Sequence, residues 1–244
     1  MVTKSAYRKA LVRFYREEKV IGAGFYVANG YVLTCAHIVT QALGLGKSVQ
    51  LALAAVAGKS LTLDSPFIAP GQTQTAEVVP SLWRLADADL AVLRVRDTIL
   101  ARDICLPAQN WRRDWNDDDN DAGYGSYESC GFPDGHSGGG WTRGAFVDEQ
   151  ADGWIQLEAN KAQGFGIEPG FSGAPVWDAS RKAIAGMIVA RDKEREDARI
   201  GFMLPYAKLK RALEAVELFE LLGAAGAEEI PWQRAYQRVR PEID

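Results

Sequence analysis

The serine at position 172 lies in a stretch that could expose a nucleophile, Glu-Pro-Gly-Phe-Ser-Gly-Ala-Pro over residues 168–175. Glycine stands two residues before the serine and one residue after it. Tight turns on both sides would place the hydroxyl beside backbone N–H groups, which is the geometry that acyl transfer needs. Ser172 is therefore the candidate nucleophile. The same stretch also fits an ordinary tight turn before a strand, because glycine and serine are common in turns.

A serine hydroxyl is a weak nucleophile until a base removes its proton, and that base is most often a histidine oriented by a carboxylate. The chain has two histidines. His37 follows an apolar run, where a purely structural histidine is also common, and His136 lies in a glycine-rich segment. Asp89 leads directly into the apolar run 90–93, so it is placed to be partly buried and to orient an imidazole, although a charge at a strand edge is equally familiar.

The composition is that of a globular protein with enough apolar material for a core, since 47% of its 244 residues are hydrophobic and 25% are charged. A net charge of −4 with scattered Lys and Arg argues against nucleic acid as the main partner. The three cysteines, Cys35, Cys105 and Cys130, are odd in number and widely spaced, so we expect reduced thiols and a cytoplasmic location. Neither a signal peptide nor an apolar run of ~18 residues is present, so we expect no membrane attachment.

Short β-rich runs separated by Gly and Pro turns dominate the chain and indicate an all-β sandwich or barrel. The expected strands are residues 10–15, 22–27, 31–34, 49–56, 75–79, 90–95, 129–131, 145–147, 154–158, 174–177 and 183–190. The segment 41–57 is rich in Ala and Leu and could also be helical in part. From Pro205 to Gly223 the apolar residues recur every third or fourth position, which predicts an amphipathic C-terminal helix.

A polar, acidic stretch at residues 111–126 interrupts this pattern and is the expected domain boundary. It divides the chain into an N-terminal unit (1–110), a linker (111–126), a C-terminal unit (127–204), the helix (205–223) and a tail (224–244) that could dock or link.

Four acidic residues near this boundary have the spacing of ligands in a calcium loop: Asp117, Asp119, Asp121 and Glu128. The sixth position of that loop is Ala122 where the sharp turn needs glycine, so a solvated acidic linker is the favoured interpretation. The histidines and cysteines show no zinc-ligand spacing. We therefore expect no metal and no cofactor.

Three motifs, in this order, resemble the His, Asp and Ser motifs of the trypsin/chymotrypsin-like serine peptidases: Thr-Cys-Ala-His at 34–37, Asp-Leu-Ala-Val-Leu at 89–93 and Gly-Phe-Ser-Gly-Ala-Pro at 170–175. The intervals of 52 residues (37 to 89) and 83 residues (89 to 172) also suit that family. Residues 22–27 match the strand before the histidine, and residues 131–135 are similar to the bacterial HtrA-like branch. The resemblance covers residues 8 to 205.

The resemblance implies a chymotrypsin-like fold, two six-stranded antiparallel β-barrels with the active site in the cleft between them, followed here by the C-terminal helix. It also assigns roles. His37 would be the general base, Asp89 would fix its tautomer, and Ser172 would be the nucleophile. The backbone N–H groups of Gly170 and Ser172 would form the oxyanion hole.

By the same resemblance, the base of the substrate-specificity pocket lies at Gly166, with walls from Ile188, Val189 and Ala190. No acidic residue stands at Gly166 to pair with a basic substrate residue, so we expect a small or apolar residue at P1, the residue before the cut. Glu168 and Arg191 keep charged alternatives open.

One position departs from the family pattern. Secreted members carry Asp immediately before the serine, where it pairs with an N-terminus released by cleavage, whereas this chain has Phe171. We therefore expect activity not to depend on a cut at the N-terminus. The chain more closely resembles the cytosolic bacterial peptidase domains that serve as effector modules in defence systems.

These observations predict a serine endopeptidase that acts on protein substrates through an acyl-enzyme intermediate, with a regulatory protein or a fused signalling domain as a possible partner. Two alternatives remain. One is a binding module of protease fold that has lost activity, and the other is an esterase, which would use the same triad on a different substrate.

Overall fold

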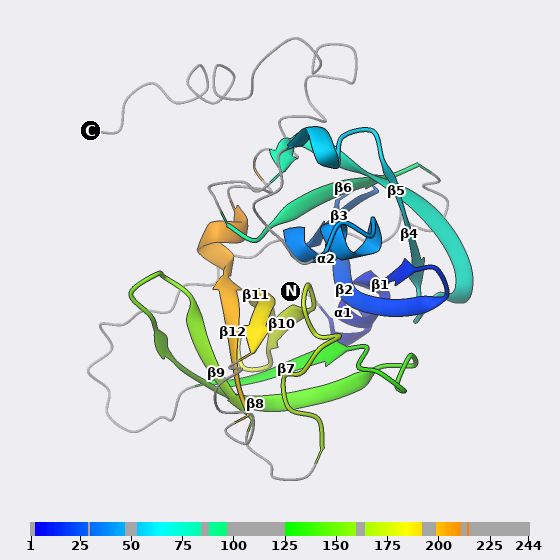
Figure 1. Ribbon diagram of the computed structural model, residues 1–244. Coiled ribbons are helices and arrows are strands. Elements are labelled where there is room, and N and C mark those ends of the chain that lie inside the picture. The colour runs from blue at the N-terminus through cyan, green and yellow to red at the C-terminus, as the bar shows by residue number, and fades with distance from the viewer. Residues whose placement is uncertain are drawn as a thin grey trace, which may run out of the picture.

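Two closed β-barrels packed side by side make up the structure, a computed structural model (Figure 1). It describes residues 3–28, 30–46, 53–83, 88–96, 125–159, 164–191, 199–210 and 214. Each barrel has six antiparallel strands. The sequence-based expectation of an all-β fold with two six-stranded antiparallel barrels is confirmed.

The first barrel is drawn in blue and cyan in Figure 1. Its strands are β1 (Leu11–Arg16), β2 (Lys19–Ala28), β3 (Tyr31–Thr34), β4 (Ser60–Ser65), β5 (Ala69–Trp83) and β6 (Ala91–Val95). They follow the order β1-β2-β3-β6-β5-β4, and pairing between β1 and β4 closes the barrel. Helix α1 (Lys4–Ala10) precedes β1, helix α2 (Ala36–Ala42) follows β3, and the short 3₁₀ turn η1 spans Leu53–Ala55.

The second barrel is drawn in green, yellow and orange in Figure 1. Its strands are β7 (Ser126–Gly131), β8 (Gly140–Glu149), β9 (Ile155–Ala159), β10 (Pro175–Asp178), β11 (Ala183–Arg191) and β12 (Ile200–Pro205). Their order is β10-β11-β12-β9-β8-β7, closed by pairing between β10 and β7. After β12 the chain turns helical at residues 206–210, so a C-terminal helix begins where the pattern after Pro205 predicts it.

The strand expected at residues 49–56 is wrong for its described part, because residues 53–55 form the turn η1. Residues 51–56 of that segment are all apolar, without the alternation that separates a strand from a helix. Strands β4 and β12 were not predicted, although Leu61 and Leu63 of β4 alternate with polar residues. Nor were α1 and α2, whose seven residues each are too short for a clear helical period.

Several expectations concern residues outside the described part of the chain. These are Cys105, the linker except for its last two residues, the acidic positions 117–121, most of the C-terminal helix and the tail at 224–244. Glu128 is described and pairs with Lys4 of α1 and with Arg143 of β8.

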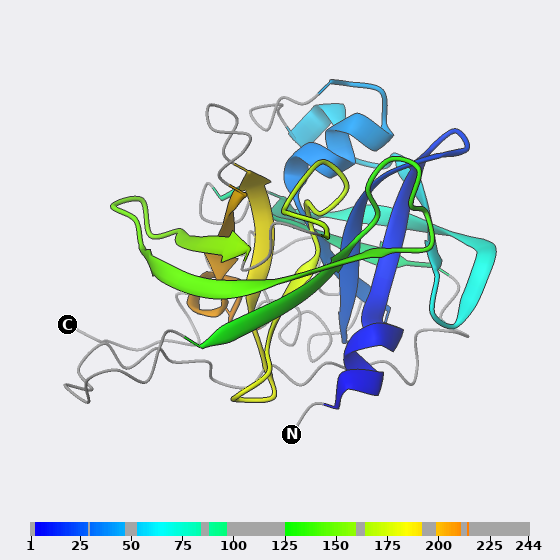
Figure 2. The same cartoon turned by 90° about the horizontal axis from the view of Figure 1, so that it is seen from below.

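Helix α1 leads into β1 of the first barrel (Figure 2), and its side chains contact the second barrel, because Lys4 and Tyr7 hydrogen-bond to residues of β7 and β10. The fully buried Tyr7 donates its hydroxyl hydrogen to the Pro175 carbonyl at 3.0 Å and accepts the Cys130 N–H at 3.2 Å. Its ring lies 5.7 Å from that of Trp177. The N-terminal segment therefore ties β7 to β10, close to the turn that carries Ser172.

Candidate active site

The pairing of β3 with β6 brings His37 and Asp89 to one edge of the first barrel. Thr34 lies opposite Ala91 in the antiparallel register. His37 comes three residues after Thr34, in the first turn of α2, and Asp89 comes two residues before Ala91. Because β3 and β6 run in opposite directions, the segment that follows β3 and the segment that precedes β6 lie at the same end of the strand pair.

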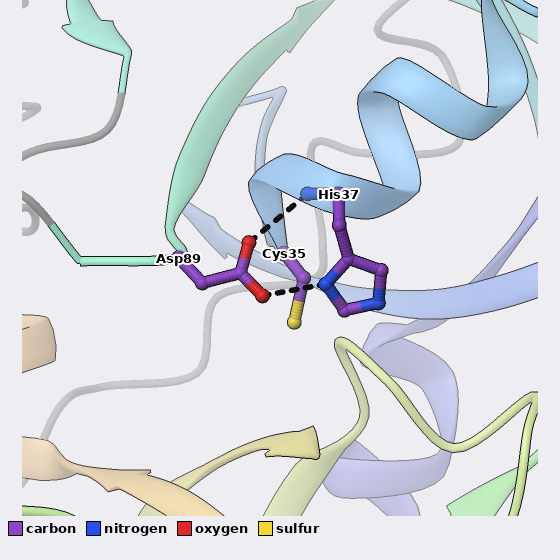
Figure 3. Close-up of side chains that lie close together, drawn as sticks. All are labelled: Cys35, His37 and Asp89. Carbon is purple, nitrogen blue, oxygen red and sulfur yellow. Dashed lines mark hydrogen bonds and ion pairs between the residues drawn. The ribbon is translucent and has the colours of Figure 1, made fainter. Parts of the chain in front are cut away.

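The Asp89 carboxylate makes two contacts with His37 (Figure 3). Oδ1 accepts the His37 backbone N–H at 3.0 Å, and Oδ2 lies 2.5 Å from the ring nitrogen Nδ1. The first contact satisfies an N–H in the opening turn of α2, which has no partner within the helix. The second places a proton on Nδ1, because a carboxylate can only accept, so the neutral imidazole presents Nε2 as its basic nitrogen.

Helix α2 is held in place through Gly22 of β2. A Cβ atom at Gly22 would lie 2.5 Å from Cδ1 of Ile38, the residue after His37. The missing side chain lets Ile38, which is 1% exposed, pack directly on β2. The glycine noted in the sequence before the histidine thus fixes the helix on which His37 is carried.

The turn that carries Ser172 lies against the first barrel. The Ser172 carbonyl accepts the Ala23 N–H at 2.9 Å, and the Ala23 carbonyl accepts the Thr34 hydroxyl at 2.7 Å. A Cβ atom at Gly173 would lie 2.0 Å from the Ala23 oxygen. Only glycine therefore fits after the serine, for its φ of +86° and for this close approach.

A shared acceptor joins the serine turn to the residues just before His37. The Ile188 carbonyl of β11 accepts the Gly173 N–H at 2.8 Å and the Cys35 thiol at 3.3 Å. The structure thus brings His37, Asp89 and the Ser172 turn to one place at the junction of the barrels. Among the described residues, no hydrogen bond links the Ser172 hydroxyl to His37; such contacts often tighten only when substrate binds.

His136 is elsewhere. It lies in the loop between β7 and β8, exposed, with its ring 4.8 Å from that of Phe165 in an edge-on arrangement. Of the two histidines, it is His37 that contacts Asp89.

Gly170 has a backbone conformation that suits few other residues, with φ at +105°. Its carbonyl accepts the Phe132 N–H at 2.9 Å, and a Cβ atom there would lie 2.4 Å from the Phe132 oxygen. Within the described part of the chain, the N–H groups of Gly170 and Ser172 donate to no protein acceptor. Both N–H groups are therefore available to a ligand oxygen.

Phe171 is fully buried in the core of the second barrel. A Cβ atom at Gly131 would lie 2.5 Å from its ring, so the ring packs directly on the end of β7. Its N–H donates to the Glu168 carbonyl at 3.1 Å, and its carbonyl accepts the Ala174 N–H at 2.9 Å. An apolar anchor therefore holds the serine turn at the position where secreted relatives are expected to have Asp.

Cys35 lies beside the histidine and the aspartate, and one potential ligand atom from each of the three falls within 4.8 Å of the others. Burial and the nearby Asp89 charge raise the pKa of the Cys35 thiol well above its ordinary value of 9.0. A metal would need the thiolate and a free carboxylate, whereas this thiol stays protonated on the Ile188 carbonyl and Asp89 is engaged with His37. The group suits proton transfer better than metal binding.

The residues expected to form the specificity pocket fall on two segments. Ile188, Val189 and Ala190 belong to β11, and Gly166 lies in the segment before the serine turn. Sequence reasoning missed Arg199, whose side chain runs beside Gly166 at 3.5 Å from where a Cβ atom would be. Its guanidinium donates to the Gly164 carbonyl at 3.3 Å. No spacing rule pairs residues 164 and 199, so the contact needed the fold.

Residues 22–187 match the family model of the trypsin-like peptidase domain. Because the match covers more than half of the chain, the protein belongs to this family, as its three motifs predict. No curated protein sequence matches the chain.

Similar solved structures are serine proteases of the same fold. The Rv3671c protease of Mycobacterium tuberculosis in its active form is 20% identical, with a TM-score of 0.56 over 86% of this chain and 82% of that one. Its inactive form is 19% identical, with a TM-score of 0.56 over 86% and 90%. The serine endoprotease of Yersinia pestis is 19% identical, with a TM-score of 0.59 over 88% and 66%. At these identities the likeness supports the fold.

Across the described ranges, no helix has both the length and the apolar character needed to span a bilayer.

Proposed function

We propose that the protein is a serine endopeptidase that cleaves protein substrates through an acyl-enzyme intermediate. The observation that carries the proposal is the double contact of Asp89 with His37, at 3.0 Å and 2.5 Å, beside a serine turn hydrogen-bonded to the same barrel. A carboxylate that fixes both the backbone and the ring of a histidine is what a general base for serine requires.

In the proposed reaction, the Ser172 hydroxyl oxygen attacks the carbonyl carbon of the scissile peptide bond while His37 Nε2 takes its proton. The negative charge that develops on the carbonyl oxygen is stabilised by the N–H groups of Gly170 and Ser172. His37 then gives the proton to the leaving amine, and the acyl group remains on Ser172. Water, activated by His37 in the same way, releases the second product.

For the substrate, we propose a small or apolar residue at P1. The cationic Arg199 side chain beside Gly166 disfavours a basic P1 residue, because like charges repel. A fluorogenic peptide library would reveal the preference. Dominant cleavage after Lys or Arg would refute the proposal, while dominant cleavage after Asp or Glu would instead make Arg199 the selective residue.

We also propose a regulated effector role in the bacterial cytoplasm, for example in defence, with a regulatory protein or fused signalling domain as partner. Two free, buried cysteines, Cys35 and Cys130, support a reducing location. The M. tuberculosis protease was crystallised in active and inactive forms, which offers a precedent for switching in this fold. Activity assays in the presence and absence of proteins encoded nearby would test the role.

Labelling with a fluorophosphonate probe tests the mechanism directly, because the probe reacts only with an activated serine. We expect wild type to be labelled, Ser172→Ala to be unlabelled, and His37→Ala to lose about 10³-fold or more in labelling rate. A folded wild type that resists the probe under all conditions tried would favour the alternative, a binding module without activity. Hydrolysis of small esters with no cleavage of any protein or peptide would favour an esterase.

A further inference from the structure

Arg13 on β1 links the first barrel to the loop between β7 and β8, residues 132–139. Its Nε donates to Asp64 Oδ1 at 2.8 Å, a second guanidinium nitrogen donates to Asp64 Oδ2, and the third donates to the Ser137 carbonyl. The guanidinium also lies 5.7 Å from the centre of the Phe132 ring. One side chain therefore contacts two positions, Phe132 and Ser137, of a loop that belongs to the other barrel.

The 132–139 loop packs directly against the backbone of Gly170. The Phe132 N–H donates to the Gly170 carbonyl at 2.9 Å, and a Cβ atom at Gly170 would lie 2.8 Å from Pro133 Cα. At its far side the His136 ring packs on Phe165, five residues before Gly170. A displacement of the loop would therefore move the backbone that carries the Gly170 N–H.

The pair that anchors this contact is buried. Arg13 is 7% exposed and Asp64 is 0% exposed, and Asp64 also accepts the Gly71 N–H at 2.7 Å. The Asp64 hydrogen bond raises the pKa of Arg13 above its ordinary value, so the guanidinium keeps its charge. A buried ion pair does not by itself explain stability, because desolvation offsets much of the attraction. The geometry of the pair does constrain the position of the 132–139 loop, because the rigid guanidinium group donates hydrogen bonds to Asp64 and to Ser137 at the same time. A lysine ammonium group cannot do this equally well.

We propose that Arg13 is a positioning residue for the oxyanion hole: held by Asp64, it fixes the 132–139 loop, and the loop aims the Gly170 N–H. The inference rests on the proposed function and extends it to the N-terminal strand of the first barrel. Arg13 would act from the side of the first barrel, whereas Phe171 holds the same turn from the core of the second barrel. The nearby exposed pair of Lys19 and Asp134 touches the same loop, but exposed pairs contribute little.

The test compares Arg13→Lys with Arg96→Lys, a matched change in an arginine that pairs with Glu77 in the same barrel and is itself exposed. For the best fluorogenic peptide from the library, we expect Arg13→Lys to lower kcat by about 10-fold or more, with KM within about 2-fold, because the lost interaction acts on the transition state. A peptide aldehyde of the same sequence, which forms a tetrahedral adduct, should bind more weakly by a similar factor. Arg96→Lys should match wild type.

Chemical rescue adds a readout that a merely structural role would not give. In Arg13→Ala, added guanidinium chloride at a non-denaturing concentration should restore part of kcat, and methylammonium chloride at equal concentration should not. If the single variants fail to fold by thermal melting, the double variant of Arg13→Gln with Asp64→Asn removes both buried charges and should still show the kcat loss.

A folded Arg13→Lys or double variant with kcat within about 2-fold of wild type would overturn the inference, as would a loss confined to KM. These outcomes differ from a failure of the proposed function, in which wild type itself would neither cleave peptides nor react with the fluorophosphonate probe.

Discussion

Replacing Gly170 with alanine tests most directly whether the serine turn forms an oxyanion hole. The added methyl group would lie 2.4 Å from the Phe132 oxygen and 2.6 Å from its carbonyl carbon, both backbone atoms. At that distance the two segments must separate. The Phe132 N–H···O=C Gly170 bond of 2.9 Å would lengthen, and the Gly170 N–H would turn away from the substrate oxygen.

The magnitude follows from two contributions. A φ of +105° disfavours any residue with a Cβ atom and costs about 1–3 kcal/mol of stability. Losing one oxyanion donor costs about 10²–10³ in kcat, or about 2.7–4 kcal/mol of transition-state stabilisation. We therefore expect Gly170→Ala to lower both the melting temperature and kcat.

Gly164→Ala is the matched control, because Gly164 also has a φ of +105° but nothing lies within 4 Å of its Cβ position. Backbone strain should be the same in the two variants, whereas the steric conflict at Phe132 belongs to Gly170 alone. The assay is the rate of fluorophosphonate labelling and of peptide cleavage, together with thermal melting. Equal losses of kcat in the two variants would refute the reasoning, since strain alone would then explain the effect.

Four further predictions concern the supports of the site and the stability of the fold. Phe171→Asp places a carboxylate in a fully buried apolar position, so it should abolish fluorophosphonate labelling; unchanged turnover would show that the anchor is not needed. Tyr7→Phe leaves the Cys130 N–H without its acceptor and should cost about 1–3 kcal/mol in urea unfolding, and an unchanged midpoint would contradict this. A cut between residues 10 and 15 should likewise not switch activity on, because it separates Tyr7, which hydrogen-bonds to β7 and β10, from the rest of the chain; a gain of activity would be the contrary result. Burial raises the pKa of Cys130 to about 12 and that of Cys35 above 9.0, so both thiols stay protonated in the folded state and ionise first in the unfolded state. The contribution of the protonated thiols to the free energy of unfolding should therefore be fully present below about pH 8.5 and be lost as the pH rises above that value. The free energy of unfolding should fall less steeply with pH in Cys130→Ala than in wild type. Equal slopes against pH for the two proteins would exclude thiol ionisation as the cause.

The sequence alone determined the chemistry that the site could support. Serine between glycines, a histidine after one apolar strand and an aspartate before another are local features, and their order along the chain indicates the family. The sequence also shows that residue 171 is a phenylalanine, and an apolar residue before the serine cannot pair with a charged N-terminus. The alternating runs predict the barrels because burial of one strand face imposes a period of two.

Which residues hold that chemistry in place depends on contacts that form only in the folded protein. The contact between His37 and Asp89 depends on the register that sets Thr34 opposite Ala91. Arg13 and Ser137 are 124 residues apart, and Arg199 lies 35 residues from Gly164. Such contacts leave no pattern in the chain, because loop conformation and barrel packing create them. The proposed nucleophile and its partners are therefore encoded in short motifs, whereas the contacts proposed to position the oxyanion hole form only when the two barrels pack together.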